Sequence, residues 1–200
     1  MDMNKTAIIS VDVEEWYHLD YFCGDRSAHS VMDGLENILS VLDEEEIPAS
    51  FFIVTELLAR PRFNFHILKQ YGDDVGIHSS SHKKPNTQCV EEFSEDLKTA
   101  INDFIEYFSQ APTGYRAPCF AIDKEKVELV RAKNFLYDSS KIDLPQNKLY
   151  GNFDLTDYEK ISSLVYKYQD FTVFEVPTKK TTTASLPIGG GGYLRIIPSW

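Results

Sequence analysis

Short apolar runs alternate with longer amphipathic stretches along most of this chain of 200 residues. The apolar runs predict buried strands at residues 6–13, 49–55, 74–77, 113–116, 135–137 and 170–176. Apolar residues at helical spacing predict helices at residues 31–46, 91–108 and 123–133, and an interrupted helical stretch at residues 56–71. Strands and helices that alternate in this way are typical of a parallel α/β sheet or barrel.

The alternation ends after Ser140. Residues 141–158 have the composition of a loop, and glycines 189–192 lie between apolar, strand-like segments. Such a run indicates either a flexible linker or a backbone in close approach to a ligand or another strand. We find no internal repeat and no second domain boundary, so we expect residues 1–200 to form one domain.

Polar side chains follow most of the predicted strands. They are Asp12 and Glu14 after the first strand, His78 and His82 after the third, Arg116 after the fourth and Asp138 after the fifth. If the sheet is parallel, the carboxyl ends of its strands share one rim, and these groups converge there. This convergence is a stronger indication of a functional site than any one of the motifs.

The His78-Ser79-Ser80-Ser81-His82 segment has a spacing that suits a metal. Two imidazoles and one carboxylate make a three-ligand site with an open position, the pattern of catalytic zinc. The alternative is a pair of solvated histidines in a serine-rich loop. On an extended strand end, Asp12 and Glu14 point the same way, so one can be a metal ligand and the other a base. The alternative there is a solvated acidic loop that includes Glu15.

Arg116 precedes Ala117-Pro118, which favours an extended backbone. An arginine at this rim can hold a carboxylate by a bidentate pair, and the alternative is a surface arginine. Asp138 is open to the same two interpretations. The pattern of polar strand ends assigns no role to the other histidines, His18, His29 and His66, and His66 is interpreted as structural.

Composition narrows the classes of partner. The formal charge of −11 argues against nucleic acid and anionic membranes, which are bound through basic patches. The cysteines Cys23, Cys89 and Cys119 have no framework spacing and favour a reducing compartment. We see no secretory signal and no run near the roughly 18 apolar residues of a membrane span. A cytoplasmic protein is therefore expected.

Four motifs, in this order, resemble the polysaccharide deacetylase family, the NodB-homology carbohydrate esterases. They are Ser10-Val11-Asp12-Val13-Glu14, His78-Ser79-Ser80-Ser81-His82, Arg116-Ala117-Pro118-Cys119-Phe120 and Tyr137-Asp138-Ser139-Ser140. The phrases VDVEEWYH and LPIGGGGYLRIIP are similar to the exopolysaccharide-cluster branch of that family. The resemblance runs from about Ala7 to the end of the chain.

The resemblance implies an irregular (β/α) barrel with fewer than eight strands, and metal-assisted removal of an acetyl group from a carbohydrate. It assigns Asp12 as the general base, and a divalent metal, expected to be zinc, to His78, His82 and an acid of the first motif. Many members have Asp-Asp in that motif. This chain has Asp-Val-Glu, so Glu14 is the expected ligand and Glu15 the reserve.

Further roles carry over from the same motifs. Arg116 is expected to orient Asp12, and the backbone N–H of Cys119 to stabilise the oxyanion. Tyr137, Asp138 and Tyr193 are expected to bind the substrate.

One feature departs from the family pattern, because no histidine follows His82 to act as the general acid. We expect a C-terminally incomplete barrel that lacks its last strands; alternatively, His18 is the acid, or the protein binds sugar without turnover. An allantoinase-like amidohydrolase on the same fold is the other alternative function.

Overall fold

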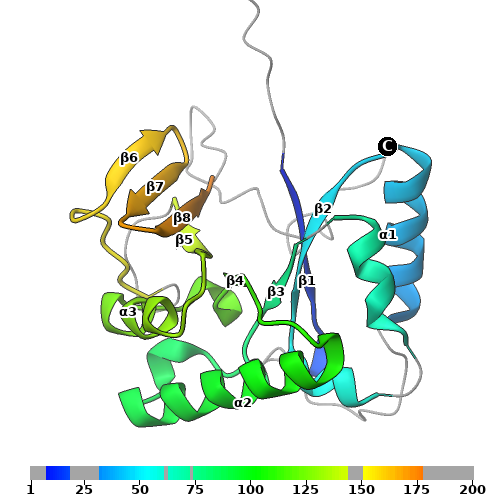
Figure 1. The fold of residues 1–200 in the computed structure, drawn as a ribbon, viewed down its shortest axis with the longest axis horizontal. Coiled ribbons are helices and arrows are strands. Elements are labelled where there is room, and N and C mark those ends of the chain that lie inside the picture. Colours follow the sequence, from blue (N-terminus) through cyan, green and yellow to red (C-terminus); the bar gives the residue numbers. More distant parts are fainter. Residues whose placement is uncertain (1–7, 19–31, 61–62, 73, 144–150, 178–200) are drawn as a thin grey trace, which may run out of the picture.

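A computed structural model of the protein describes residues 8–18, 32–60, 63–72, 74–143 and 151–177 (Figure 1). These residues form one eight-stranded sheet with the order β1-β2-β3-β4-β5-β8-β7-β6. The strands are β1 (Ile9–Val13), β2 (Ala49–Ile53), β3 (Val75–Ile77), β4 (Gly114–Tyr115), β5 (Tyr137–Ile142), β6 (Glu159–Ser162), β7 (Val165–Tyr168) and β8 (Phe171–Val176). The helices are α1 (Met32–Glu44), α2 (Val90–Phe108) and α3 (Lys124–Ala132), which lie around the outside of the curved sheet in Figure 1.

The predicted α/β architecture is confirmed. Strands β1 to β5 and β8 pair in parallel, whereas β6, β7 and β8 pair antiparallel. The expected interrupted helical stretch at residues 56–71 is present, but its described residues form two short 3-10 helices, Thr55–Ala59 and Phe65–Gln70, and not α-helix. Pro61 lies between them, and proline interrupts helical hydrogen bonding.

Strand register divides the sheet into two faces. The outer face, covered by helices, carries a row of paired residues that consists of Val13, Ile53, Ile77, Tyr115, Asp138 and Val173. The preceding row points to the opposite, inner face and consists of Asp12, Phe52, Gly76, Gly114, Tyr137 and Thr172. The largely apolar outer row forms part of the hydrophobic core, and the inner face is free to carry polar groups.

Two glycines make room on the inner face. A Cβ on Gly76 would lie 2.6 Å from the carbonyl oxygen of Gly114 and 3.0 Å from Phe52 Cδ1. A Cβ on Gly114 would overlap the ring of Tyr137. At these two positions of the inner face, aromatic rings therefore pack against bare backbone.

Helix α2 is the longest element and supports the sheet from outside. It begins at a capping box formed by Cys89 and Glu92, which satisfies backbone N–H groups at its N-terminus. Its buried stripe consists of Phe93, Leu97, Ala100, Phe104 and Phe108. The apolar spacing predicted this helix to within one residue at its start.

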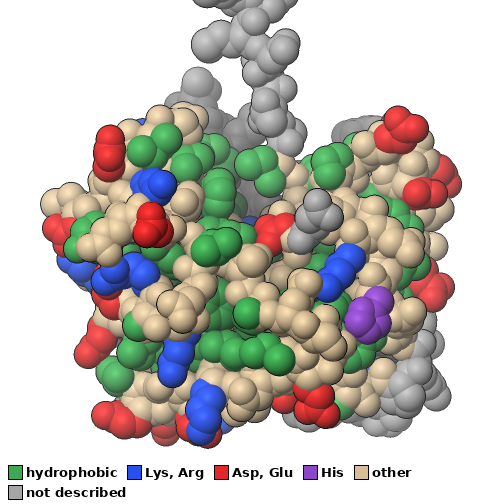
Figure 2. Space-filling view, in the orientation of Figure 1, with side chains coloured by type: hydrophobic (Ala, Val, Ile, Leu, Met, Phe, Trp, Pro, Cys, Tyr) green, Lys and Arg blue, Asp and Glu red, His purple; other side chains and the backbone are tan. Residues whose placement is uncertain are grey.

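The surface agrees with the acidic composition. On the face shown in Figure 2, acidic side chains lie around the edge with basic side chains among them. Within the described ranges, no helix has the length and apolar character needed to cross a bilayer.

Candidate metal centre

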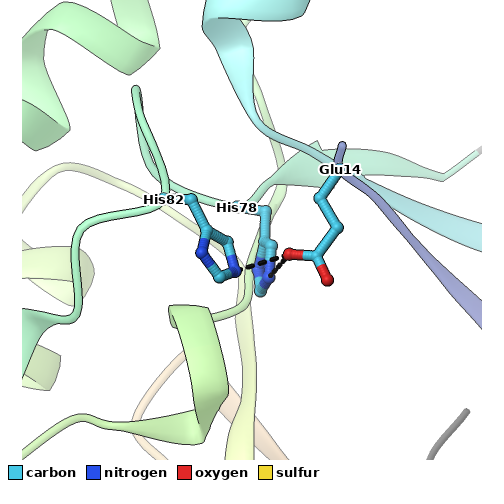
Figure 3. Close-up of side chains that lie close together, drawn as sticks. All are labelled: Glu14, His78 and His82. Atoms are coloured by element: carbon cyan, nitrogen blue, oxygen red, sulfur yellow. Dashed lines mark ion pairs between the residues drawn. The ribbon is translucent and has the colours of Figure 1, made fainter. Parts of the chain in front are cut away.

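Glu14, His78 and His82 lie together at the carboxyl ends of β1 and β3 (Figure 3). Glu14 Oε2 lies 2.5 Å from His82 Nε2 and 3.8 Å from His78 Nε2. One ligand atom from each residue lies within 4.8 Å of the others. Both imidazole side chains are 3% exposed and the Glu14 side chain is 24% exposed, so the cluster is nearly closed to solvent.

Backbone carbonyl groups orient both imidazole rings. His78 Nδ1 donates to the carbonyl oxygen of Arg116 at 2.8 Å, and His82 Nδ1 donates to that of His18 at 2.9 Å. Because a carbonyl can only accept, a neutral ring in either position carries its proton on Nδ1 and presents the Nε2 lone pair to the centre. This is the arrangement in which a histidine is held as a metal ligand.

The donor set fits a divalent metal. Glu14 Oε2 is buried and has no hydrogen-bond donor among the described residues, and a buried carboxylate without a partner is costly. Burial lowers the pKa of His78, which keeps its ring neutral and able to ligate. A cation between one carboxylate oxygen and two Nε2 atoms would satisfy all three groups, and zinc accepts this mixture of ligands.

The two histidines lie on a loop, and two residues with positive φ shape it. Ser79 has a φ of 66° and His82 a φ of 61°. Asp96 of α2 holds this loop from outside, since its carboxylate accepts from Ser80 Oγ at 2.5 Å and from the Ser80 N–H at 3.4 Å. The four-residue spacing therefore brings the two rings together through a tight loop and not along a helix.

Asp12 forms an ion pair with Arg116 beside this cluster. Arg116 Nη1 donates to Asp12 Oδ1 at 2.9 Å and to Ser10 Oγ at 3.0 Å. The other nitrogens of the guanidinium donate to Ser139, Nη2 to Oγ at 2.7 Å and Nε to the carbonyl oxygen at 3.2 Å. The contact with Asp12 thus uses one nitrogen instead of the bidentate pair that we expected. Ser139 and the Phe52 ring, 4.1 Å from the guanidinium carbon, fix the arginine in place.

The environment keeps Asp12 charged. Burial disfavours its carboxylate, but the charge of Arg116 and the Arg116 hydrogen bond oppose burial, and the pKa of Asp12 is lowered. The carboxylate is therefore ready to accept a proton near neutral pH.

Adjacent acids have different partners. Glu14 contacts the two histidines, whereas the buried Glu15 accepts from Arg60 Nη1 at 3.0 Å. Of the expected ligand and its reserve, the structure brings only Glu14 to the imidazoles.

His18, the alternative general acid of the sequence analysis, lies next to His82. Its buried ring stacks on that of His82 with 5.7 Å between centroids. Its Nδ1 accepts from the Glu15 N–H at 3.0 Å, and its Nε2 lies 2.9 Å from Glu56 Oε1. Both ring nitrogens are thus engaged, so in this arrangement His18 has no nitrogen available to protonate a leaving group. The signal that could have found it was its position four residues after Glu14.

Asp138 lies apart from the other polar residues. The predicted strand at residues 135–137 is wrong in position, since β5 starts at Tyr137 and contains Asp138. Asp138 is 0% exposed on the outer face, where it accepts from Ser140 Oγ at 2.7 Å and from the Ser140 N–H at 2.8 Å. Ser140 Oγ in turn accepts from the Ala117 N–H at 2.8 Å. This placement supports the Arg116 loop, and a direct contact of Asp138 with substrate stays a prediction that its burial does not favour.

The remaining expected residues lie in different environments. Tyr137 is on the inner face, where its hydroxyl donates to Asp74. Cys119 has a φ of 55° in the turn after Arg116, a left-handed conformation that aims its peptide groups differently from a regular helix. Tyr193 and the glycines at 189–192 lie outside the described residues.

Described residues of the inner face line a cavity of about 480 Å³ beside Arg116. Its polar lining includes Ser10, Asp74, Tyr137 and Ser139. Arg116, which also binds Asp12, is therefore shared by the cavity lining and the ion pair next to the metal cluster.

Comparisons with known proteins agree on one family. A family model described as Polysaccharide deacetylase matches residues 25–137, more than half of the chain. A peptidoglycan deacetylase from Helicobacter pylori is 24% identical over 107 residues, which are 54% of this chain and 36% of the relative. The peptidoglycan deacetylase-like protein FGM2 from Gibberella zeae is 23% identical over 154 residues, 72% of this chain and 46% of the relative. The chain thus spans less than half the length of these curated relatives.

Solved structures share the fold. A Mycobacterium smegmatis structure assigned to the polysaccharide deacetylases has a TM-score of 0.54 and 21% identity, and covers 73% of this chain and 46% of its own. PuuE allantoinase has a TM-score of 0.53 and 18% identity, with coverage of 74% and 44%. At these identities the likeness extends to the fold alone. The family match over more than half of the chain does go further, and it places this protein in the polysaccharide deacetylase family.

Proposed function

We propose that this protein is a metal-dependent deacetylase that removes an acetyl group from an N-acetylated sugar or polysaccharide, with residues 1–200 as one deacetylase domain. One observation carries the proposal: Glu14, His78 and His82 converge, and the Asp12–Arg116 pair lies next to them. The names of the curated relatives, both of which refer to peptidoglycan deacetylases, support an N-acetylated glycan as the substrate. The VDVEEWYH phrase leads us to place the chain in the exopolysaccharide-cluster branch.

The chain's own residues would each perform one task. Glu14, His78 and His82 would hold the metal, which when bound supplies a Lewis acid for the acetyl carbonyl and lowers the pKa of a water. Asp12 would take the proton of that water, and Arg116 would keep Asp12 charged and in place. The backbone N–H of Cys119 would donate to the developing oxyanion.

The leaving amine must also receive a proton. Neither of the other described histidines is placed to supply it, because both nitrogens of His18 are engaged and His66 lines a separate groove with Tyr107. The proton that Asp12 takes from water can serve, so that Asp12 acts first as base and then as acid. Water adds its OH to the acyl carbon, the C–N bond breaks, and the products are acetate and the free amine.

Acetate release from N-acetylglucosamine oligomers tests this function. We expect the full chain with zinc to release acetate, and both chelation and His82→Ala to abolish the release. The matched control His66→Ala removes an exposed imidazole from the separate groove and should keep the activity. Activity that survives thorough chelation would favour an allantoinase-like amidohydrolase instead. Stoichiometric zinc binding without turnover on any acetylated glycan would favour a sugar-binding protein.

A further inference from the structure

A single short segment supplies two parts of the metal centre. Glu14 offers its carboxylate, and four residues later the carbonyl oxygen of His18 accepts from His82 Nδ1 at 2.9 Å. Between them a 3-10 helix, Trp16–His18, turns the chain, with the His18 N–H donating to the Glu15 carbonyl oxygen at 3.0 Å. The position of this turn therefore determines both one ligand and the orientation of another.

The His18 side chain locks the turn. Its Nδ1 accepts from the Glu15 N–H, so the ring proton must be on Nε2, which donates to Glu56 Oε1 at 2.9 Å. The ring is buried and stacks nearly parallel to that of His82, with 17° between their planes. His18 cannot rotate without losing both hydrogen bonds and its packing.

Glu56 joins this turn to the histidine loop. Its carboxylate binds His18, and its backbone N–H donates to the carbonyl oxygen of Ser80 at 3.0 Å. The preceding N–H, of Thr55, donates to the carbonyl oxygen of Ser79 at 3.1 Å. Glu56, which follows β2, thus connects the segment that carries Glu14 with the loop that carries His78 and His82.

We propose that His18 and Glu56 form a positioning unit that holds His82 Nε2 and the Glu14 carboxylate at the spacing a metal requires. Neither side chain touches the metal position, so both act through other groups. The inference rests on the proposed metal dependence and adds to it residues that the motif resemblance assigns no such role. Loss of an outer partner of a metal-bound histidine typically weakens metal binding 10- to 100-fold. We expect about tenfold here, because the unit acts through a backbone carbonyl.

The chain offers informative variants. Glu56→Gln keeps an oxygen that can accept from His18 Nε2, whereas Glu56→Ala removes it. His18→Phe keeps a stacked ring without hydrogen bonds. Glu106→Ala is the matched control, because Glu106 is an exposed acid that lines the same groove as Glu56.

Zinc affinity, measured on the full chain by competition with a chromophoric chelator, tests the unit without relying on activity. We expect Glu56→Ala and His18→Phe each to raise the zinc Kd about tenfold, and the double variant to be no worse than either. Glu56→Gln and Glu106→Ala should stay within twofold of the parent protein. The zinc Kd is measured at a temperature well below the thermal unfolding midpoint of each metal-free variant, so that a loss of fold stability cannot account for weaker zinc binding.

The outcomes separate the two proposals. A parent protein that binds zinc, together with Glu56→Ala and His18→Phe variants that bind it equally well, overturns the positioning unit and leaves the proposed function intact. Additive effects in the double variant also overturn it, because the two residues would then act independently. A parent protein that binds no zinc overturns both proposals. If Glu56→Ala does not fold, the zinc Kd of His18→Phe is compared with that of Glu56→Gln. Equal values for these two variants would then overturn the positioning unit.

Discussion

The two faces of the sheet give two aspartates, from neighbouring rows of residues, opposite environments. Asp12 is on the inner face, with its side chain 29% exposed, and it pairs with a guanidinium. Asp138 is on the outer face, fully buried, and its partners are the neutral hydroxyl and N–H of Ser140. The pKa of Asp12 is lowered because the charge of Arg116 and its hydrogen bond to Asp12 oppose burial. Burial raises the pKa of Asp138 to about 6 because its hydrogen bonds do not offset burial.

The difference teaches that position along a strand is not enough to assign a role. Both aspartates follow apolar residues near a rim of polar groups, yet the alternation of side chains along a strand places one on the inner face and the other on the face covered by helices. The faces are nevertheless linked through consecutive residues. Arg116 reaches inward to Asp12, and the Ala117 N–H reaches Ser140, which binds Asp138.

The largest effect is expected on the inner face, at the proposed base. Asp12→Asn keeps the size and a hydrogen-bond acceptor for Arg116 but cannot take a proton. We expect acetate release to fall by about 10³-fold, within the range of lost general-base catalysis. Zinc binding, measured separately, should persist. Acetate release equal to that of the parent protein would show that Asp12 is not the base.

Substitution of Arg116 should have the next largest effect. Arg116→Lys keeps the charge but cannot bind Ser139 and Asp12 together, and we expect roughly a 10²-fold loss of turnover from misplacement of the base. Arg116→Gln also removes the charge that lowers the pKa of Asp12. Because the base works only when deprotonated, its acid limb in the pH–rate profile should move to higher pH in Arg116→Gln and less in Arg116→Lys. Identical acid limbs in all three proteins would contradict the role of this pair.

Asp138→Asn tests the outer face through stability. The pKa of Asp138 rises from its ordinary 3.8 to about 6 in the fold, so the native state keeps the proton to a higher pH than the unfolded chain. This group therefore favours folding at low pH, and that contribution is lost as the pH rises from about 4 to about 6. The effect is at most about 3 kcal/mol. Urea unfolding of both proteins across this pH range should show a smaller decline in the free energy of unfolding for the variant. Parallel pH profiles of the two proteins would contradict the raised pKa of Asp138.

Glycine substitutions test the packing of the inner face. Gly76→Ala places a Cβ 2.6 Å from the Gly114 carbonyl oxygen, and we expect the free energy of unfolding to drop by roughly 1–3 kcal/mol. Gly34→Ala is the control, because a Cβ there meets open space on α1, and it should raise the free energy of unfolding by roughly 0.5–1 kcal/mol. Chemical denaturation gives both values. Equal effects of the two substitutions would show that the inner face is not tightly packed.

Much of the site follows from local patterns. The apolar runs place the strand that contains Asp12 and the strands that precede His78 and Arg116, and the two-residue spacing of Asp12 and Glu14 predicts a shared side. These inferences depend only on alternation and on the shared rim of parallel strands. Asp138 could not be placed, because the strand predicted to end at residue 137 continues to Ile142, which turns a residue beyond the strand into one within it.

Other features depend on contacts between distant segments. His18 gains its place from Glu56 and His82, which lie 38 and 64 residues away in the chain. Strands β6 and β7 lack a clear apolar alternation, and every residue of β6 is exposed. The antiparallel pairing of β6 with β7 and of β7 with β8, and not burial, therefore defines them. No periodicity in the sequence carries this information.

The central claim is that Glu14, His78 and His82 hold one metal ion on the inner face. Anomalous scattering at the zinc edge, from crystals of the full chain grown with zinc, tests it most directly. We predict one strong peak about 2.0–2.2 Å from a Glu14 carboxylate oxygen and from the Nε2 atoms of His78 and His82, with Asp12 beside it. A zinc peak elsewhere, or none at this cluster in zinc-saturated crystals, would contradict the account.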